Sequence, residues 1–265
     1  MIEFFRSAWR AGLRSHSFQA VLVLGCVLMF FAFLAASFSP RQPKTIALDV
    51  GFTGLRLSLV LLSIFWVQEF VGKEIERRLV FFSLTYPASR AEYLLGRYFA
   101  VLALSGLAAL LLALLLLLVV LVGGGQYDQE FPVALGLPFW ITVAGIWLDA
   151  AVVGAFAMLI ASLSTVTALP LVLGIAFAIA GKGLGPALDY LAKGEDEALS
   201  ATYAPIVNNI QWLLPDLSRL DWRPWPMYSL EAAPAELIWA LVMAFGYIVT
   251  LLVLAIRMLE RREFS

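Results

Sequence analysis

The chain has 265 residues, of which 62% are apolar and only 14% are charged, and its formal net charge is −1. A water-soluble domain carries about 25% charged residues, so this composition indicates that lipid surrounds most of the chain. The near-zero net charge gives no case for nucleic acid as a partner. The single cysteine, Cys26, excludes a disulfide framework within the chain.

A short amphipathic segment precedes the first apolar run. Over residues 2–14, Phe4, Phe5 and Trp9 fall on one side of a helix, and arginines occupy the other side. Apolar residues on one face and basic residues on the other are typical of a helix that lies in the membrane interface. We therefore predict an N-terminal interfacial helix over these residues.

Six apolar runs are long enough to cross a bilayer, which takes about 20 residues of helix. They cover residues 18–38, 55–71, 98–122, 137–161, 163–180 and 237–256. The second run is short and begins near Arg56, and the fifth contains Pro170, which should kink it. The predicted fold class is all-α: a polytopic membrane protein with six transmembrane helices, forming a single transmembrane domain over residues 1–265.

The distribution of lysine and arginine predicts the orientation, because these residues are enriched in cytoplasmic loops. Basic residues precede the first run, lie between the second and third runs and follow the sixth, whereas the loop 123–136 has none. We predict a multi-pass protein of the plasma (inner) membrane with both termini cytoplasmic.

This orientation places a large loop, residues 181–234 between the fifth and sixth runs, on the extracytoplasmic side. The loop opens with a cluster of helix breakers, Gly181–Pro186, and later carries Trp222 and Trp225. Tryptophans of this kind favour the membrane surface. Two interpretations stay open, a lid over an exit path and a packed structural cap, and the loop is also a candidate site for an extracytoplasmic partner.

The charged segment Gly72–Gly96 separates the second and third runs. Its first part, Gly72–Leu84, is predicted to form an amphipathic helix whose distinctive residues are Glu74, Glu76, Arg77, Arg78, Leu79 and Phe82. Pro87 ends this helix, and Ser89 with Glu92 has the spacing of a capping box for the next helix. We predict that this segment contacts a cytosolic partner.

Asp149 lies near the centre of the fourth run. A carboxylate at that depth costs about 2.5–3.5 kcal/mol on insertion scales, so it must face the bundle interior, water or a partner. Three roles remain open at this point: a hydrogen bond between helices, the lining of a transport path, and proton coupling.

The sequence contains no motif for nucleotide or metal chemistry. A P-loop ends in Gly-Lys-Ser/Thr, but Gly181-Lys182 is followed by Gly183, and His16 is the only histidine. We therefore expect no catalytic site, no ATPase site, no metal and no cofactor bound by this chain. The alternative is a membrane-embedded enzyme that uses Asp149 as its acid.

Several short patterns resemble a known family. The loop contains Thr85-Tyr86-Pro87, Ser89-Arg90 and Leu95-Gly96-Arg97, and the tail contains Arg261-Arg262-Glu263-Phe264. With an interfacial helix, six spans and a large outer loop, the chain resembles the permease subunits of type-2 ABC exporters (ABC-2 type). Its pattern is most similar to the subgroup that serves nitrous oxide reductase maturation.

The resemblance implies a permease that works as a homodimer and couples ATP hydrolysis on a separate cytosolic ATPase to export across the membrane. ATP and Mg would bind to that ATPase. Gly72–Leu84 would be the coupling helix that docks into it, and Asp149 would be a candidate for the transport path. The alternative within this reading is a membrane module that uses ATP to act on a protein partner.

Overall fold

The computed structural model describes residues 1–39, 41–76, 89–123, 132–164, 166, 168–193 and 215–261. These residues form helices and turns, and no strand occurs among them. Six helices are long and apolar enough to cross a membrane, which confirms an all-α architecture of this kind. They are α2 (His16–Ser37), α3 (Pro43–Val67, continued by the π-helix η1, Gln68–Gly72), α6 (Arg90–Gly123), α7 (Leu137–Leu163), α8 (Leu169–Lys193) and α11 (Pro234–Arg261).

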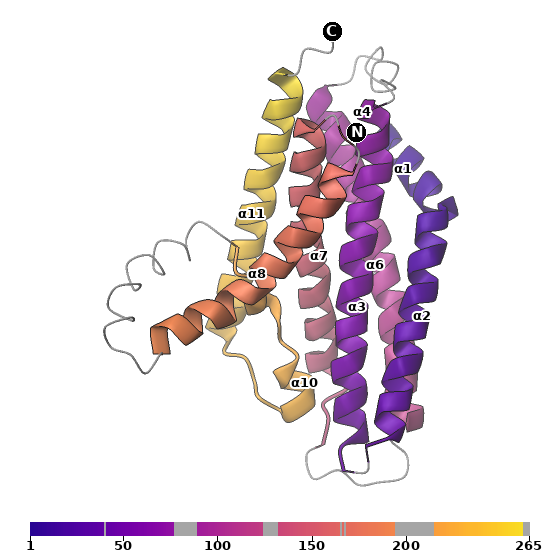
Figure 1. Cartoon of the computed structure of the whole chain (residues 1–265), viewed down its shortest axis with the longest axis vertical. Helices are drawn as coiled ribbons and strands as arrows, with labels where there is room; N and C mark the ends of the chain where they lie inside the picture. Colours follow the sequence, from indigo (N-terminus) through magenta and orange to yellow (C-terminus); the bar gives the residue numbers. More distant parts are fainter. Residues whose placement is uncertain are drawn as a thin grey trace.

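Four shorter elements lie at the ends of this bundle: α1 (Ile2–Arg14), α4 (Lys73–Glu76), η2 (Leu217–Leu220) and α10 (Pro224–Tyr228). Figure 1 shows α1, α4 and the C-terminal end of α11 at one end, and the start of α3 with α10 toward the other. The figure also shows α8 crossing the bundle obliquely. α1, α4 and the C-terminal end of α11 therefore share one end of the molecule.

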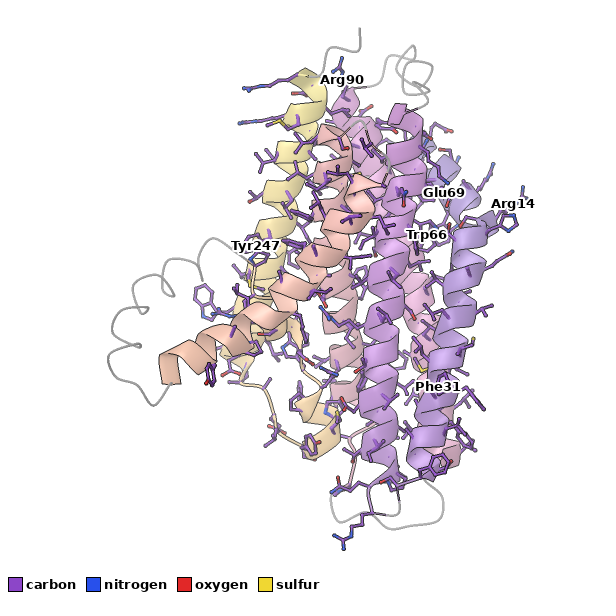
Figure 2. The ribbon with its side chains drawn as sticks, in the orientation of Figure 1. Arg14, Phe31, Trp66, Glu69, Arg90 and Tyr247 are labelled. Carbon is purple, nitrogen blue, oxygen red and sulfur yellow. The ribbon has the colours of Figure 1, made fainter. Side chains whose placement is uncertain are left out.

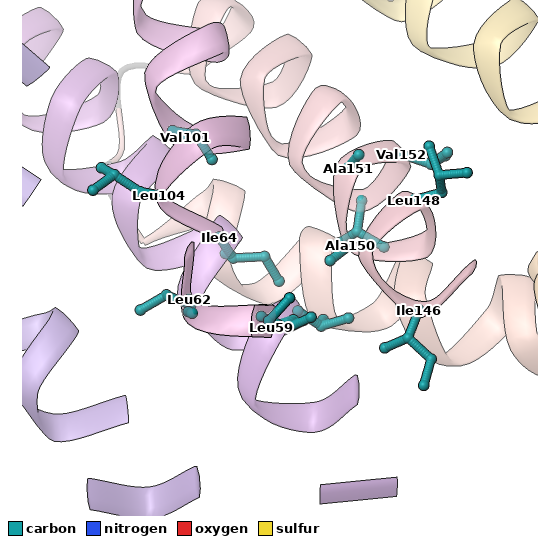
Figure 3. Packing of buried hydrophobic residues seen from close by; sticks show 14 of the residues in the cluster. Leu59, Leu62, Ile64, Val101, Leu104, Ile146, Leu148, Ala150, Ala151 and Val152 are labelled. Carbon is teal, nitrogen blue, oxygen red and sulfur yellow. The ribbon is translucent and has the colours of Figure 1, made fainter. Parts of the chain in front are cut away.

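α3 and α7 form the centre of the bundle. Phe52 and Trp66 of α3 and Phe139 of α7 are completely buried, and Figure 3 shows part of the packing around α3. In contrast, α2 and α11 expose apolar side chains, such as Phe31 in Figure 2, which points away from the bundle. An apolar outer surface of this kind suits contact with lipid acyl chains.

α3 differs from the predicted second run. The helix begins at Pro43, whose fixed backbone angle suits the first turn of a helix, and continues without a break into η1 at Gly72. The sequence prediction started this run at Leu55, after the charged residues Lys44 and Asp49. As a consequence, Arg56 lies in the middle of a 30-residue span rather than at its outer end.

α8 also differs from its prediction in two ways. Pro170 is the second residue of the helix, where a proline needs no hydrogen-bond partner, so it does not kink the span. The cluster Gly181–Pro186 lies inside the helix, with Pro186 tolerated there. A Cβ at Gly181 would lie 2.7 Å from Leu217 Cδ1, and one at Gly185 would lie 2.7 Å from Asp216 Oδ1. These glycines allow the returning chain to pack closely against α8, and the outer loop begins beyond residue 193.

The predicted N-terminal helix and the predicted cap of α6 are both present. α1 buries Ala8 and Gly12, and Phe4 packs edge-on against Tyr93 of α6 with ring centroids 5.4 Å apart. The backbone N–H of Glu92 donates to Ser89 Oγ at 3.1 Å, which is half of the capping box. α1 is thus held against the first turns of α6.

Candidate functional site

Six charged side chains lie close together, from the buried Asp149 out to the exposed Asp49, and we call them the charge network. Its three acids and three bases come from α3, α7, α8 and the segment 216–223: Asp49, Arg56, Asp149, Lys182, Asp221 and Arg223. Their formal charges cancel, as is required of charges held in a medium of low dielectric constant.

α3 supplies two members of the network because Asp49 and Arg56 are seven residues apart. Seven residues make about two helical turns, so both side chains lie on the same face of α3. Arg223 Nη1 approaches Asp49 Oδ1 at 3.2 Å and donates to Thr53 Oγ1 at 3.0 Å, one turn away. One face of α3 is therefore polar along its outer half.

Arg56 and Asp149 form the deepest pair of the network. The Arg56 Nε–H donates to Asp149 Oδ2, and Arg56 Nη2 donates to the carbonyl oxygen of Ala178 at 3.3 Å. Asp149 is 2% exposed, and its second oxygen, Oδ1, has no hydrogen-bond partner. Arg56 thus joins α3 to α7 and α8 at one level, and half of the Asp149 carboxylate is left available to another donor.

Asp221 is the centre of the outer part of the network. It pairs with Lys182 of α8 and, at 2.7 Å, with Arg223 Nη2. Burial raises the pKa of Asp221, but the hydrogen bond from Arg223 and the charge of Lys182 outweigh it and lower the pKa far below its usual range. The hydrogen bond with Asp221 likewise raises the pKa of Arg223. Asp221 and Arg223 are therefore both charged across the range of ordinary pH.

The segment that carries Asp221 packs firmly onto α7. A Cβ at Gly145 would lie 2.6 Å from the carbonyl oxygen of Leu220 and 2.8 Å from Trp222 Cε3. Thr142 Oγ1 lies 3.0 Å from the Trp222 carbonyl oxygen, and the N–H of Ala134 donates to the carbonyl oxygen of Pro226 at 2.9 Å. For residues 215–228, these contacts are those of a packed cap.

A second polar cluster lies at the opposite end, beside α4. Glu74 Oε1 pairs with Arg97 Nη2 at 2.5 Å, and Glu74 Oε2 accepts a hydrogen bond from the Tyr93 hydroxyl at 2.6 Å. Arg97 is 7% exposed and also donates to Ser7 Oγ of α1 at 3.2 Å. This cluster ties α1, α4 and α6 together.

Two of the six predicted coupling residues, Glu74 and Glu76, lie in the described part of the chain. Both carboxylate oxygens of Glu74 are engaged within the chain, by Arg97 and Tyr93 of α6. Glu76 is the last residue of α4. The other four, Arg77, Arg78, Leu79 and Phe82, lie outside the described residues.

Arg90 anchors the chain directly after that segment. Its guanidinium Nη1 donates to the carbonyl oxygens of Leu259 at 2.5 Å and Glu260 at 3.0 Å, and Figure 2 shows Arg90 beside the end of α11. A cation at a helix C-terminus satisfies carbonyl groups that have no partner within the helix. The segment 77–88 is thus bounded by two fixed points, one on α6 and one on α11.

Sequence reasoning singled out Asp149 and Arg56 but missed the other four members of the charge network. Lys182 and Arg223 were assigned to the outer loop, and Asp49 fell outside the expected second span. The available signal was the seven-residue spacing of Asp49 and Arg56, which places both on one helical face. In the described part of the chain, no three His, Cys, Asp or Glu side chains gather as a metal site would require.

Comparison of the chain with models of protein families and with curated proteins found no match.

Proposed function

We propose that the chain is the membrane-spanning subunit of an ATP-driven exporter, a permease that works as a homodimer with a separate cytosolic ATPase. The observation that carries the proposal is the ion pair of Arg56 and the buried Asp149 inside a bundle of six apolar helices, together with the other charges of the network beside it. Charged side chains are costly within spanning helices, and where they occur they mark substrate paths and moving parts. The network joins α3 and α7, at the centre of the bundle, to α8.

The two anchors beside α4 and α6 support the coupling part of the proposal. Glu74 holds one side of the segment 77–88 to Arg97, and Arg90 holds the other side to the end of α11. A displacement of this segment by a cytosolic ATPase would reach both α6 and α11. ATP and Mg would bind to the ATPase, and this chain would transmit the motion.

The orientation in this proposal has both termini and the segment 73–97 in the cytoplasm of a plasma (inner) membrane, with the loop after α8 outside. Accessibility of single cysteines in right-side-out vesicles tests it, in a background in which Cys26 is replaced. Lys193→Cys should react with an impermeant reagent in intact vesicles. Reaction only after the vesicles are opened would contradict the orientation.

Affinity purification of the tagged chain from native membranes tests the function. We expect an ATPase subunit to copurify, with two copies of each chain in the complex by native mass spectrometry. The complex should hydrolyse ATP, and variants of the charge network should change that rate without releasing the ATPase. Purification without any ATPase, or a complex with one copy of the chain, would contradict the proposal.

A second function is favoured by one observation, the position of Asp221 and Arg223. Both members of the network belong to the segment 216–223 outside the spanning helices. Movement of the bundle would therefore displace the segment 216–223, to which a protein partner could bind. ATP hydrolysis would then change the state of that partner instead of moving a cargo. ATP hydrolysis that depends on an extracytoplasmic protein, without accumulation of any solute in vesicles, would favour this second function.

A further inference from the structure

A pocket of about 560 Å³ lies between the segment 218–225 and the start of α11. Its volume is within the range of small-molecule sites, about 300–1,000 Å³. The apolar part of α11 begins directly at the pocket, after Glu236. In the proposed orientation the pocket therefore lies where outer-leaflet lipid headgroups meet the hydrocarbon.

Three tryptophans contribute to the lining of the pocket. Trp222 is buried at its inner side, Trp225 is half-buried, and Trp239 is 68% exposed on α11. Aromatic faces attract organic cations through their quadrupole, and tryptophan does so most strongly. The lining thus favours a ligand that carries a positive charge on an otherwise carbon-rich group.

The charges that line the pocket also favour a positively charged ligand. Asp221 is neutralised by Lys182 and Arg223, and Arg219 Nε pairs with Asp216 Oδ2 at 3.3 Å. In the described part of the chain, the carboxylates of Glu231 and Glu236 make no ion pair and no hydrogen bond. The pocket therefore holds two uncompensated negative charges beside aromatic walls.

We propose that this pocket binds an alkylammonium group, supplied by the headgroup of a membrane lipid such as phosphatidylethanolamine. The ammonium would lie between the two glutamates and Trp239, and the Arg219 guanidinium is placed to approach the lipid phosphate. Below the pocket, α11 exposes Val242 and Phe245, which are 55% and 57% exposed and offer an apolar surface to acyl chains. This binding site does not depend on the proposed transport function.

Competition between two lipids tests the proposal. The purified chain in detergent is mixed with equal amounts of phosphatidylethanolamine and phosphatidylglycerol, and bound lipid is counted by native mass spectrometry. The wild type should prefer phosphatidylethanolamine, and the variant Glu236→Gln/Trp239→Ala should lose that preference by about tenfold, which corresponds to one cation site. Both side chains are exposed, so the variant should melt at the wild-type temperature.

Two matched variants serve as controls. Glu3→Gln removes an exposed carboxylate from the first turn of α1, as Glu236→Gln does for α11, and Trp140→Ala removes an exposed tryptophan from α7. Both controls should keep the wild-type preference. The proposal would be overturned if the wild type preferred phosphatidylglycerol. It would also be overturned if Glu236→Gln/Trp239→Ala preferred phosphatidylethanolamine as strongly as the wild type and the controls do.

Free ethanolamine distinguishes the source of the ammonium group. Displacement of the lipid by millimolar ethanolamine would support the site and show that the headgroup is sufficient for binding. Persistence of the lipid, together with the loss in Glu236→Gln/Trp239→Ala, would support the site and show that the acyl chains on α11 contribute. Neither result bears on ATP hydrolysis, so the failure of this proposal is distinguishable from failure of the transport proposal.

Discussion

Arg56 of α3 and Asp149 of α7 form an ion pair within the six-helix bundle, although 93 residues separate them in the chain. An isolated aspartate at this depth would be a cost that its removal relieves. A paired aspartate is different, because its removal leaves the arginine unpaired in the same interior.

Replacement of either partner alone should therefore destabilise the protein more than replacement of both. Arg56→Leu and Asp149→Leu should each lower the free energy of unfolding by about 3–5 kcal/mol, and Arg56→Leu/Asp149→Leu should recover much of that loss. Thermal melting in detergent measures this, with the exposed Arg10→Leu as the control. A double variant that loses as much stability as the two single variants added together would show that the two side chains are not coupled.

The packing of Trp222 onto Gly145 predicts a selective effect of side-chain size. Gly145→Val places carbon atoms against the backbone of Leu220, so it should displace the segment 215–228 and cost about 1–3 kcal/mol of stability. Gly246→Ala in α11, where the new Cβ meets nothing within 4 Å, should instead stabilise by about 0.5–1 kcal/mol. Limited proteolysis of the segment and melting curves would separate the two, and unchanged proteolysis in Gly145→Val would contradict the packed cap.

Arg97 should hold α1 and α4 to α6. Arg97→Met leaves Glu74 without its ion pair and Ser7 without its donor, so we expect a loss of about 1–3 kcal/mol. Glu74→Gln added to Arg97→Met should restore part of this loss, because the unpaired carboxylate is then neutral. Hydrogen exchange of α1 measures the effect, and protection at the wild-type level in Arg97→Met would exclude the anchoring role.

The stability of the outer segment should depend on pH through Asp221, whose pKa the cationic partners lower. This contribution is fully present above the pKa of an unfolded aspartate, about 4. It is lost as the pH falls toward the lower pKa of the folded state, where the folded protein also takes up the proton. Melting temperature measured from pH 7 downward should fall less steeply in Asp221→Asn than in the wild type. Parallel curves would show that Asp221 is not a contributing group.

The proposed coupling segment predicts an order of effects on ATPase binding. Phe82→Ala should weaken association by about 2 kcal/mol, as buried aromatic anchors do, and Glu76→Ala should weaken it less. Arg77→Glu/Arg78→Glu should lower ATP turnover while the membrane subunit stays folded, because such charges set register and partner choice. Pull-down from detergent and an ATPase assay measure both effects, and wild-type behaviour of all three variants would remove the coupling-helix assignment.

The spanning helices could be predicted from the sequence because apolar runs of about 20 residues are typical of transmembrane helices. Their limits were less predictable where polar residues face the bundle interior. Lys44 and Asp49 made the first half of α3 look like a loop, although Arg223 neutralises Asp49. Hydropathy averages over a helix and does not register which face a charge occupies.

The glycines of α8 misled the sequence analysis for a related reason. Gly181 and Gly185 read as helix breakers, but each is the point where the segment 216–218 approaches the helix. These two glycines let the backbone of α8 approach another segment closely, and that contact involves residues more than 30 positions away in the chain. The burial of Lys182 was not predictable for the same reason, because its partner Asp221 is 39 residues further along the chain.

The order of the charge network along the chain has a consequence for biogenesis. Asp49 and Arg56 enter the membrane with the second span, but Asp149 is synthesised about 90 residues later and Arg223 later still. The charges of α3 and α8 therefore have no partner within the chain until the segments that carry Asp149, Asp221 and Arg223 have been made. A chain that stops before residue 221 leaves Lys182 without Asp221 and Asp49 without Arg223.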